Sequence, residues 1–541
     1  MNAFNGTWRL VRLALRRDRM VLPAWLVVIT GLTGAVAAST PTLYSSLTER
    51  TETAVFSAAN IAARVVDGPA SGVHIGALTM LELYKFLAIL AALMSFQAVL
   101  RHTRQNEDAG RTELLGSTSL GRHAQLTAAV LVAVSANIIL IGTVTGALLM
   151  NDLDVEGSII SGVSVGAFGM LFVAIAAVAA QVMSTQREAS TFVALVLGAT
   201  FLLRAVGDAS GKAEDDPTVL VSSWVTWLSP MGWGQQVRPF YQNNWDVFIL
   251  FGVAVPVLIG LAYSLAHFRD IGEGMFSTRP GPLYAGVTLR GPIGLAWRLH
   301  RGALIGWGAG MVIAGVVFGA VADSIDDVVN MSDQFAQLLA PDQSDSDRLN
   351  FYFTFVVGVL AIVATGFTVQ TLLRPRAEEV SGHLEPVLAS ATGRIRWLMS
   401  HLIVSVLGSV LVVCLLGIGG AAAYGAVKGE LDAGTGMLTA AVVQIPAVVT
   451  VAAVVVMAFA FIPRSAPAVS WAVLIMCLVL SQFGELLDLP QSVINMSPFT
   501  HVPKVPAEDM EWRPVSVLLG TAVVLTMVGL ARFRGRNVSE G

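Results

Sequence analysis

Two stretches of the chain carry carboxylates, a glycine and an arginine at the same spacing. Each reads Glu-x-x-Gly-x-x-Glu, then eight residues, then Arg, and the two are 272 residues apart: Glu107, Gly110, Glu113 and Arg122, then Glu379, Gly382, Glu385 and Arg394. Carboxylates six positions apart would lie on different faces of one helix, and the glycine between them favours a break. Charges held in place position a protein partner more than they add affinity. The spacing predicts a docking segment, with a solvated charged loop as the alternative.

The sequence contains no other pattern of residues typical of a catalytic or metal site. No group of His, Cys, Asp and Glu has the spacing of metal ligands, and nothing resembles a Ser–His–Asp or paired-carboxylate site. The nearest approach to a phosphate loop, residues 207–213, has three residues between its glycines, lacks Ser or Thr after Lys212 and follows no predicted strand. We therefore expect no catalytic site, metal or cofactor on this chain.

The composition indicates what must position these loops. Of the 541 residues, 55% are apolar and 13% charged, and the mean hydropathy is +0.69. Soluble proteins are about a quarter charged. The formal net charge of −4 gives no electrostatic support to nucleic-acid binding. The chain is predicted to be an all-α polytopic membrane protein.

Apolar runs near 20 residues long predict about twelve membrane helices. Two of them, 191–206 and 467–483, are short enough to be tilted or to pair with a re-entrant segment. The expected spans are 20–38, 79–100, 124–150, 158–183, 191–206, 246–268, 302–322, 351–373, 397–426, 436–462, 467–483 and 514–533.

The charges between the spans predict the orientation. If the N-terminus is cytoplasmic, the cytoplasmic segments hold 23 basic and 11 acidic residues, and the opposite segments hold 8 basic and 24 acidic residues. Basic residues accumulate on the cytoplasmic side of membrane proteins. Both termini and both docking segments are therefore expected inside the cell.

The chain reads as a tandem duplication. Sequence matches recur in the same order at offsets near 275, including Arg16, Arg19 and Trp25 with Arg298, Arg301 and Trp307. We expect two six-span units, 1–270 and 293–541, joined by a cytoplasmic linker at 271–292. Units with an even number of spans are parallel and leave a seam at mid-membrane that a transport pathway could use. A duplicated bundle without a pathway is the alternative.

The twice-repeated motif in a twelve-span chain resembles the permeases of ABC-2-type transporters. The closer likeness is to the double-length actinobacterial exporters of polyketide antibiotics, the tetronasin-type group. The resemblance covers the whole chain and implies a bacterial plasma-membrane permease. It also implies interfacial helices at Trp8–Arg19 and near Ile293–Arg301.

The resemblance implies a partner and its contact sites. A separate ATPase subunit, as a homodimer, would bind ATP and Mg²⁺ and would receive coupling segments 107–122 and 379–394. Within these, the matching positions are Glu107, Gly110, Arg111, Glu113 and Arg122, then Glu379, Gly382, Glu385 and Arg394. Arg111 is replaced by His383 in the second segment and Leu114 by Pro386, so the segments need not engage the ATPase equally.

The resemblance also places the second span of each unit beside the seam between the units. Its apolar and aromatic character would suit a hydrophobic or amphipathic small-molecule cargo such as an antibiotic or drug. Packing between helices is the alternative for any single residue. The candidate pathway residues are Phe86, Leu90, Met94, Gln97, Phe355, Phe367 and Gln370.

Three other functions stay open. A lipid or envelope-precursor translocase of the same type cannot be separated from a drug exporter by sequence. A proton-driven transporter would need titratable groups deep in the bundle, whereas Glu82 and Lys85 lie near one end of their span and could pair with each other. A scaffold or sensor would be expected to carry a signalling domain, and none is visible.

Overall fold

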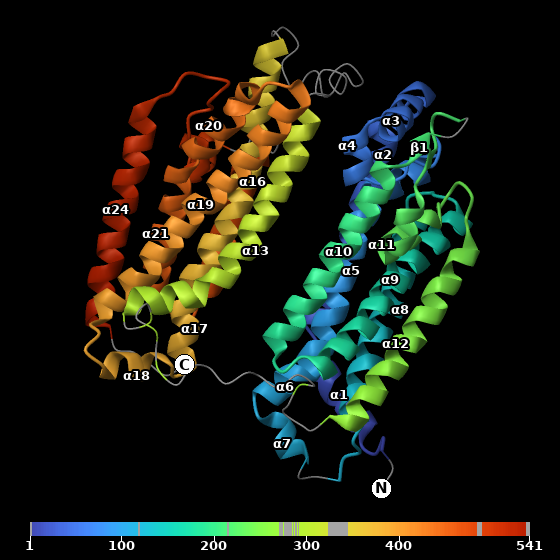
Figure 1. The fold of residues 1–541 in the computed structure, drawn as a ribbon, viewed down its shortest axis with the longest axis horizontal. Helices are drawn as coiled ribbons and strands as arrows, with labels where there is room; N and C mark the ends of the chain where they lie inside the picture. Colours follow the sequence, from blue (N-terminus) through green and yellow to red (C-terminus); the bar gives the residue numbers. More distant parts are fainter. Residues whose placement is uncertain are drawn as a thin grey trace. The chain divides into compact units, whose positions relative to one another are not determined.

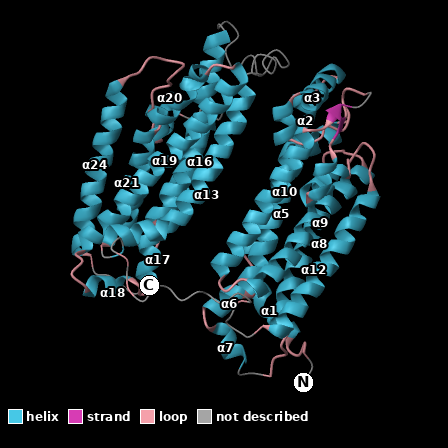
Figure 2. Ribbon diagram, viewed as in Figure 1, coloured by secondary structure: helices cyan, strands magenta, loops and turns pink. Residues whose placement is uncertain are grey.

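A computed structural model describes residues 3–116, 119–213, 216–269, 291–322, 345–483 and 490–536, with four single positions (274, 284, 286 and 289) between them. The chain forms two compact units, Met1–Gly281 and Pro282–Gly541. Most of the expected linker 271–292 lies outside the described residues. Figures 1 and 2 show that each unit is a bundle of long helices.

The N-terminal unit combines long helices with several short ones and one small hairpin. Its elements are α1 (Thr7–Arg17), α2 (Val21–Leu43), α3 (Leu47–Ala59), α4 (Ile61–Val66), α5 (Ile75–His102), α6 (Arg104–Asp108), α7 (Arg111–Gly116), α8 (Ala124–Leu149), α9 (Val155–Val182), α10 (Gln186–Ala209), β1 (Lys212–Ala213), β2 (Leu220–Val221), η1 (Trp224–Leu228), α11 (Pro230–Gln236), η2 (Trp245–Val247) and α12 (Phe248–Phe268). The strands β1 and β2 pair antiparallel.

The described part of the C-terminal unit is built from helices. Its elements are α13 (Pro292–Val321), α16 (Asp345–Leu372), α17 (Arg374–Val380), α18 (Leu384–Ala389), α19 (Arg394–Lys428), η5 (Leu431–Gly434), α20 (Thr435–Val443), α21 (Ile445–Phe461), α22 (Ala466–Phe483), α23 (Gln491–Ile494), η6 (Pro498–His501) and α24 (Trp512–Gly535).

Eleven helical segments in the described residues are long and apolar enough to cross a membrane, and a shorter apolar helix lies at Ala466–Ser481. The all-α polytopic prediction is confirmed. The expectation of a short span at 191–206 is wrong, because α10 runs for 24 residues. Its first turn is polar, and Thr185 and Glu188 form a capping box that starts the helix well before its apolar run.

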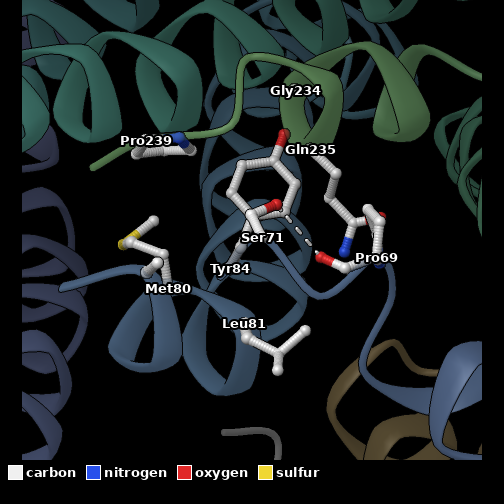
Figure 3. Close-up of a pocket in the computed structure, with 9 residues that line it drawn as sticks. Pro69, Ser71, Met80, Leu81, Tyr84, Gly234, Gln235 and Pro239 are labelled. Atoms are coloured by element: carbon white, nitrogen blue, oxygen red, sulfur yellow. Dashed lines mark hydrogen bonds between the residues drawn. The ribbon is translucent and has the colours of Figure 1, made fainter. Parts of the chain in front are cut away.

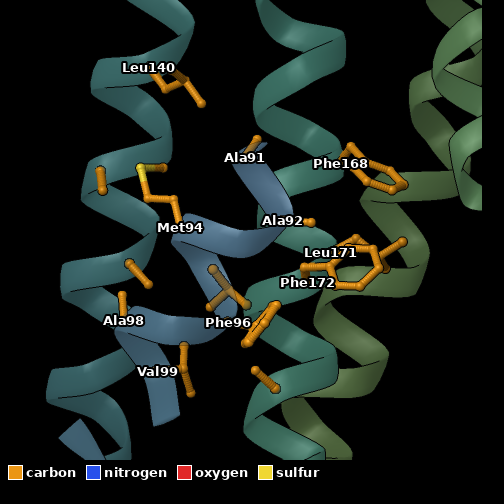
Figure 4. Packing of buried hydrophobic residues seen from close by; sticks show 14 of the residues in the cluster. Ala91, Ala92, Met94, Phe96, Ala98, Val99, Leu140, Phe168, Leu171 and Phe172 are labelled. Carbon is orange, nitrogen blue, oxygen red and sulfur yellow. The ribbon is translucent and has the colours of Figure 1, made fainter. Parts of the chain in front are cut away.

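The core of the N-terminal unit lies where α5, α8 and α9 meet, as Figure 4 shows for Met94, Leu140 and Phe172. Lipid is as apolar as these side chains, so close van der Waals packing holds such helices together. Gly166 allows the close approach of α9 to α8, since a Cβ there would collide with Ile141. Asn137 also donates a hydrogen bond from α8 to Ser95 on α5 at 2.8 Å.

In each unit a short helix packs against one of the long helices. Ser229 begins α11 and donates a hydrogen bond to the Thr200 carbonyl in α10 at 2.5 Å. Ser497 begins η6, and its hydroxyl lies 2.7 Å from that of Ser481 in α22. Both serines are fully buried. These segments therefore pack as part of the bundles.

The starts of the two units differ. Residues 7–17 form the separate helix α1, and Asp18 ends it before α2 begins. In the C-terminal unit the expected interfacial segment forms the first turns of α13, which runs as one helix from Pro292 to Val321. At 30 residues, α13 is longer than a membrane crossing requires.

Candidate functional site

Two loop regions, each following a long helix, contain the residues predicted to dock a partner. In the N-terminal unit α5 leads into α6 and α7, and in the C-terminal unit α16 leads into α17 and α18. Gly110 and Gly382 separate the paired short helices with φ of 67° and 73°. This left-handed conformation is one that glycine adopts without steric cost. The predicted break between the two carboxylates is confirmed in both loops.

Glu107 lies inside an ion network rather than on the surface. Its carboxylate is 3.0 Å from Arg104 and forms a second ion pair with Arg269, which directly follows α12. Arg104 is fully buried and donates to the Ala180 carbonyl at 2.5 Å, and Arg269 donates to the same carbonyl at 3.2 Å. Through these two arginines, the Glu107 carboxylate connects the loop after α5 to the ends of α9 and α12.

The C-terminal unit has a network of the same composition. Glu379 is 2.5 Å from Arg536, which directly follows α24, and 3.2 Å from Arg376. Arg536 donates to the Phe459 carbonyl at the end of α21 at 2.6 Å. Its guanidinium also lies over the Phe459 ring, 4.7 Å from the centroid.

The arginines that end the two motifs complete the two networks. Arg122 donates to the Arg269 carbonyl at 3.1 Å, and Arg394 donates to the Arg536 carbonyl at 2.7 Å. Both therefore hold the end of the last helix of their own unit against the loop. This contact is made in the same way in the two units.

The second carboxylate of each motif is exposed. Glu113 on α7 and Glu385 on α18 face away from their bundles, and Arg111 and His383 are exposed beside them. Leu384, next to Glu385, is buried in a cluster with Trp397, so α18 is anchored while its carboxylate faces outward. Figure 1 shows α7 and α18 at the ends of their own bundles. These helices are the parts of the motifs available to a partner.

Sequence reasoning missed the arginine partners of Glu107 and Glu379. A signal was present, because Arg104 and Arg376 precede the two glutamates by three residues and share their offset of 272. Residues three apart on a helix are neighbours. Arg269 and Arg536 lie 162 and 157 residues from their partners, which local spacing cannot reveal.

The predicted pathway residues differ in exposure. Met94 and Phe367 are buried in the cores of their own units, and Leu90 and Gln97 are half-buried. The exposed ones are Phe86, Phe355 and Gln370.

Of the two glutamines, Gln370 has a defined partner. It accepts a hydrogen bond from the Trp307 indole at 2.7 Å. The transport role of all seven residues stays a prediction.

The expected contact between Glu82 and Lys85, near the start of α5, is wrong. Each of these residues pairs with a different partner. Lys85 forms an ion pair with Asp67, and Glu82 accepts a hydrogen bond from Tyr44 at 2.5 Å. Arg204, near the end of α10, is fully buried and lies 3.4 Å from Asp208.

A small cavity lies beside this group (Figure 3). Its volume is about 30 Å³, and Tyr84, Ser71 and Gln235 are among its lining residues. A cavity needs at least about 10–15 Å³ of such volume to hold one water. The space therefore fits one or two waters and excludes a drug-sized ligand. No group of three potential metal ligands occurs within the described ranges.

Comparison with known proteins relates the chain to efflux permeases. Residues 289–534 match the family described as "Multidrug efflux system permease Rv1217c, C-terminal domain". The chain is 36% identical over 544 residues to the Multidrug efflux system permease protein Rv1217c of Mycobacterium tuberculosis. That match covers 99% of this chain and 96% of the relative.

Proposed function

The chain belongs to the family of multidrug efflux permeases that includes Rv1217c, and from this membership we propose that it is the membrane permease of an ATP-driven exporter of hydrophobic small molecules. Its place is the bacterial plasma membrane, with both termini and both motif loops in the cytoplasm. The near-complete coverage of the relative supports a transport role for the whole chain.

The observation that carries the proposal is the twin arrangement of the motif loops. Each presents an exposed glutamate, Glu113 or Glu385, on the short helix that follows the glutamate in the ion network of its unit. Exposed charges on a rigid support suit recognition of a protein partner. The partner in this proposal is a separate ATPase subunit that acts as a homodimer and binds ATP and Mg²⁺, with one subunit at each loop.

The networks also suggest how movement would pass into the membrane. Glu107 in the first loop forms an ion pair with Arg269 at the end of α12. A displacement of α7 by a bound partner would therefore displace the end of α12. Glu379 and Arg536 make the same connection between α18 and α24. Packed helices held by ion pairs move as rigid bodies between discrete arrangements. Closure of the ATPase dimer would thus shift the last helix of each unit with its loop.

The test uses the full-length permease expressed with its ATPase subunit. Replacing both exposed glutamates, Glu113→Ala with Glu385→Ala, should weaken co-purification of the ATPase at least about tenfold, equivalent to roughly 1.4 kcal/mol. Drug-stimulated ATP hydrolysis should fall with it. Glu52→Ala with Glu430→Ala is the matched control, since both residues are exposed and lie outside the motif loops. Full co-purification and coupling in the motif double variant would refute the docking assignment.

The cargo separates this proposal from its nearest alternative, a lipid or envelope-precursor translocase. The exposed aromatic residues Phe86 and Phe355 are compatible with any apolar cargo, since apolar contact is non-directional. Transport of a fluorescent drug and of a fluorescent phospholipid into vesicles containing the full complex distinguishes the two. Drug movement without lipid movement supports the exporter, and the reverse supports the translocase.

A further inference from the structure

A large apolar cavity lies within the C-terminal unit, apart from the motif loops. Its volume is about 570 Å³, within the range of small-molecule sites. Helices α21, α22 and α24 form its walls, chiefly through the aliphatic side chains Val451, Val454, Val473, Met476, Val517 and Leu518. No acidic residue among those described lines it. The interior therefore suits a hydrocarbon group.

One end of the cavity is polar and positively charged. Arg513, in the first turn of α24, lines it together with Asn495 and His501. The His501 Nε2 lies 2.8 Å from the Asn495 carbonyl oxygen, to which it donates, so the imidazole is held at this end. Arg513 is exposed and forms no ion pair with the described residues. A guanidinium that pairs with none of the described residues and lies beside an apolar space favours a ligand with an anionic head.

The cavity follows α24 along its axis. From Arg513 to Thr521 the helix rises about 12 Å, and both residues line the cavity. Val517, between them, is 60% exposed. In a membrane helix such an exposed apolar side chain contacts hydrocarbon. Trp512, beside Arg513, is also exposed, as aromatic residues are at the membrane surface. The charged end therefore lies at head-group level and the apolar part within the bilayer.

We propose that this cavity binds one anionic phospholipid from the surrounding membrane. The Arg513 guanidinium pairs with the lipid phosphate, and one acyl chain lies along α24 past Val517. The acyl chain adds affinity for any phospholipid through apolar burial. The charge-assisted bond to Arg513 favours an anionic lipid, because the phosphate of a zwitterionic lipid already has a cationic group beside it. The site lies outside the motif loops, so it does not depend on an ATPase partner.

Native mass spectrometry of the purified full-length protein tests the proposal. The delipidated protein is titrated with phosphatidylglycerol or with phosphatidylcholine of the same acyl chains. We expect one phosphatidylglycerol to survive collisional activation that removes the other lipids, and no such retention of phosphatidylcholine. Arg513→Gln should lower the retained fraction at least about fivefold. Arg534→Gln, an exposed arginine at the other end of α24, should leave it unchanged.

A second variant tests the apolar part. Val517→Trp fills the cavity and should reduce retention of phosphatidylglycerol even with Arg513 intact, with size-exclusion behaviour confirming that it folds. Equal retention in wild type and Arg513→Gln would overturn the proposal. So would displacement of the retained lipid by a stoichiometric hydrophobic drug, because the cavity would then be a cargo site. Drug-stimulated ATP hydrolysis is measured separately, so loss of lipid retention and loss of coupling are distinguished.

Discussion

Glu379 lies 2.5 Å from Arg536, although 157 residues separate them in sequence. The pair joins the loop after α16 to the residue that follows α24. The N-terminal unit makes the same junction with Glu107 and Arg269. Each junction fixes the end of a unit's last helix to the loop that carries an exposed glutamate.

The first prediction concerns the stability of this junction. Glu379 is buried between Arg376 and Arg536. Removing one partner of a buried ion pair leaves an uncompensated charge and typically costs about 3–5 kcal/mol. Glu379→Gln should therefore lower the thermal unfolding temperature of the purified protein by several degrees. Glu385→Gln, in the same loop but exposed, should change it little; equal shifts in the two variants would contradict the buried role.

The second prediction separates docking from transmission. Glu107→Gln weakens the tie to Arg269 but leaves the exposed Glu113 in place. The variant should keep most ATPase co-purification and lose most drug-stimulated ATP hydrolysis, roughly tenfold or more, because about 1.4 kcal/mol of lost coupling gives that factor.

The matched comparison is Glu113→Gln, which should weaken association as well as hydrolysis. If the Glu107 variant retained full stimulation, the network would not transmit movement to α12.

The third prediction follows from the glycine at each break. Gly382 has a φ of 73°, and a Cβ at this position would meet no atom within 4 Å, so only backbone strain opposes a substitution. An L-residue in this conformation costs about 1–2 kcal/mol. Gly382→Ala should lower the unfolding temperature or displace α18. Gly393→Ala, in the same loop with a φ of −71° and equally open surroundings, should be neutral; a neutral result for both would argue against the strain.

The fourth prediction concerns pH. Burial alone would raise the pKa of the Asp18 carboxyl, but hydrogen bonds from His102 and Arg101, at 2.7 and 2.8 Å, outweigh it and hold the pKa below its ordinary value. A carboxyl whose pKa is lower in the folded protein adds stability above its unfolded pKa, about 3.9. That stability is lost as the pH falls through the folded value.

Asp18→Asn should therefore lower the unfolding temperature at neutral pH, and the difference from wild type should shrink below about pH 4. Unfolding is followed by tryptophan fluorescence from neutral to acidic pH. The exposed Glu52→Gln serves as control. A difference that stays constant across this range would show that the ion pairs of Asp18 do not stabilise the fold.

Much of the fold was predictable because membrane helices are long apolar runs. The glycine break was predictable as well, since glycine tolerates the positive φ found at Gly110. The starts of helices were less predictable. Residues 186–188 are polar, yet α10 begins at Gln186 because Thr185 and Glu188 cap it.

The candidate site was only partly predictable. The motif identified Glu107 but not its ion pair with Arg269, which lies near the other end of the unit in sequence. Likewise Glu82 and Lys85 share a helical face but bind Tyr44 and Asp67 from segments earlier in the chain. In the folded protein each group contacts a residue from another segment instead of its helical neighbour, and local spacing does not reveal such contacts.

The central claim, that this chain is the permease of an ATP-driven exporter, is tested most directly by purification from native membranes in mild detergent. We expect a soluble ATPase subunit to co-purify at about two copies per chain, and the complex to show vanadate-sensitive ATP hydrolysis. A chain that purifies alone and without ATP hydrolysis, also after chemical cross-linking in intact membranes, would contradict it.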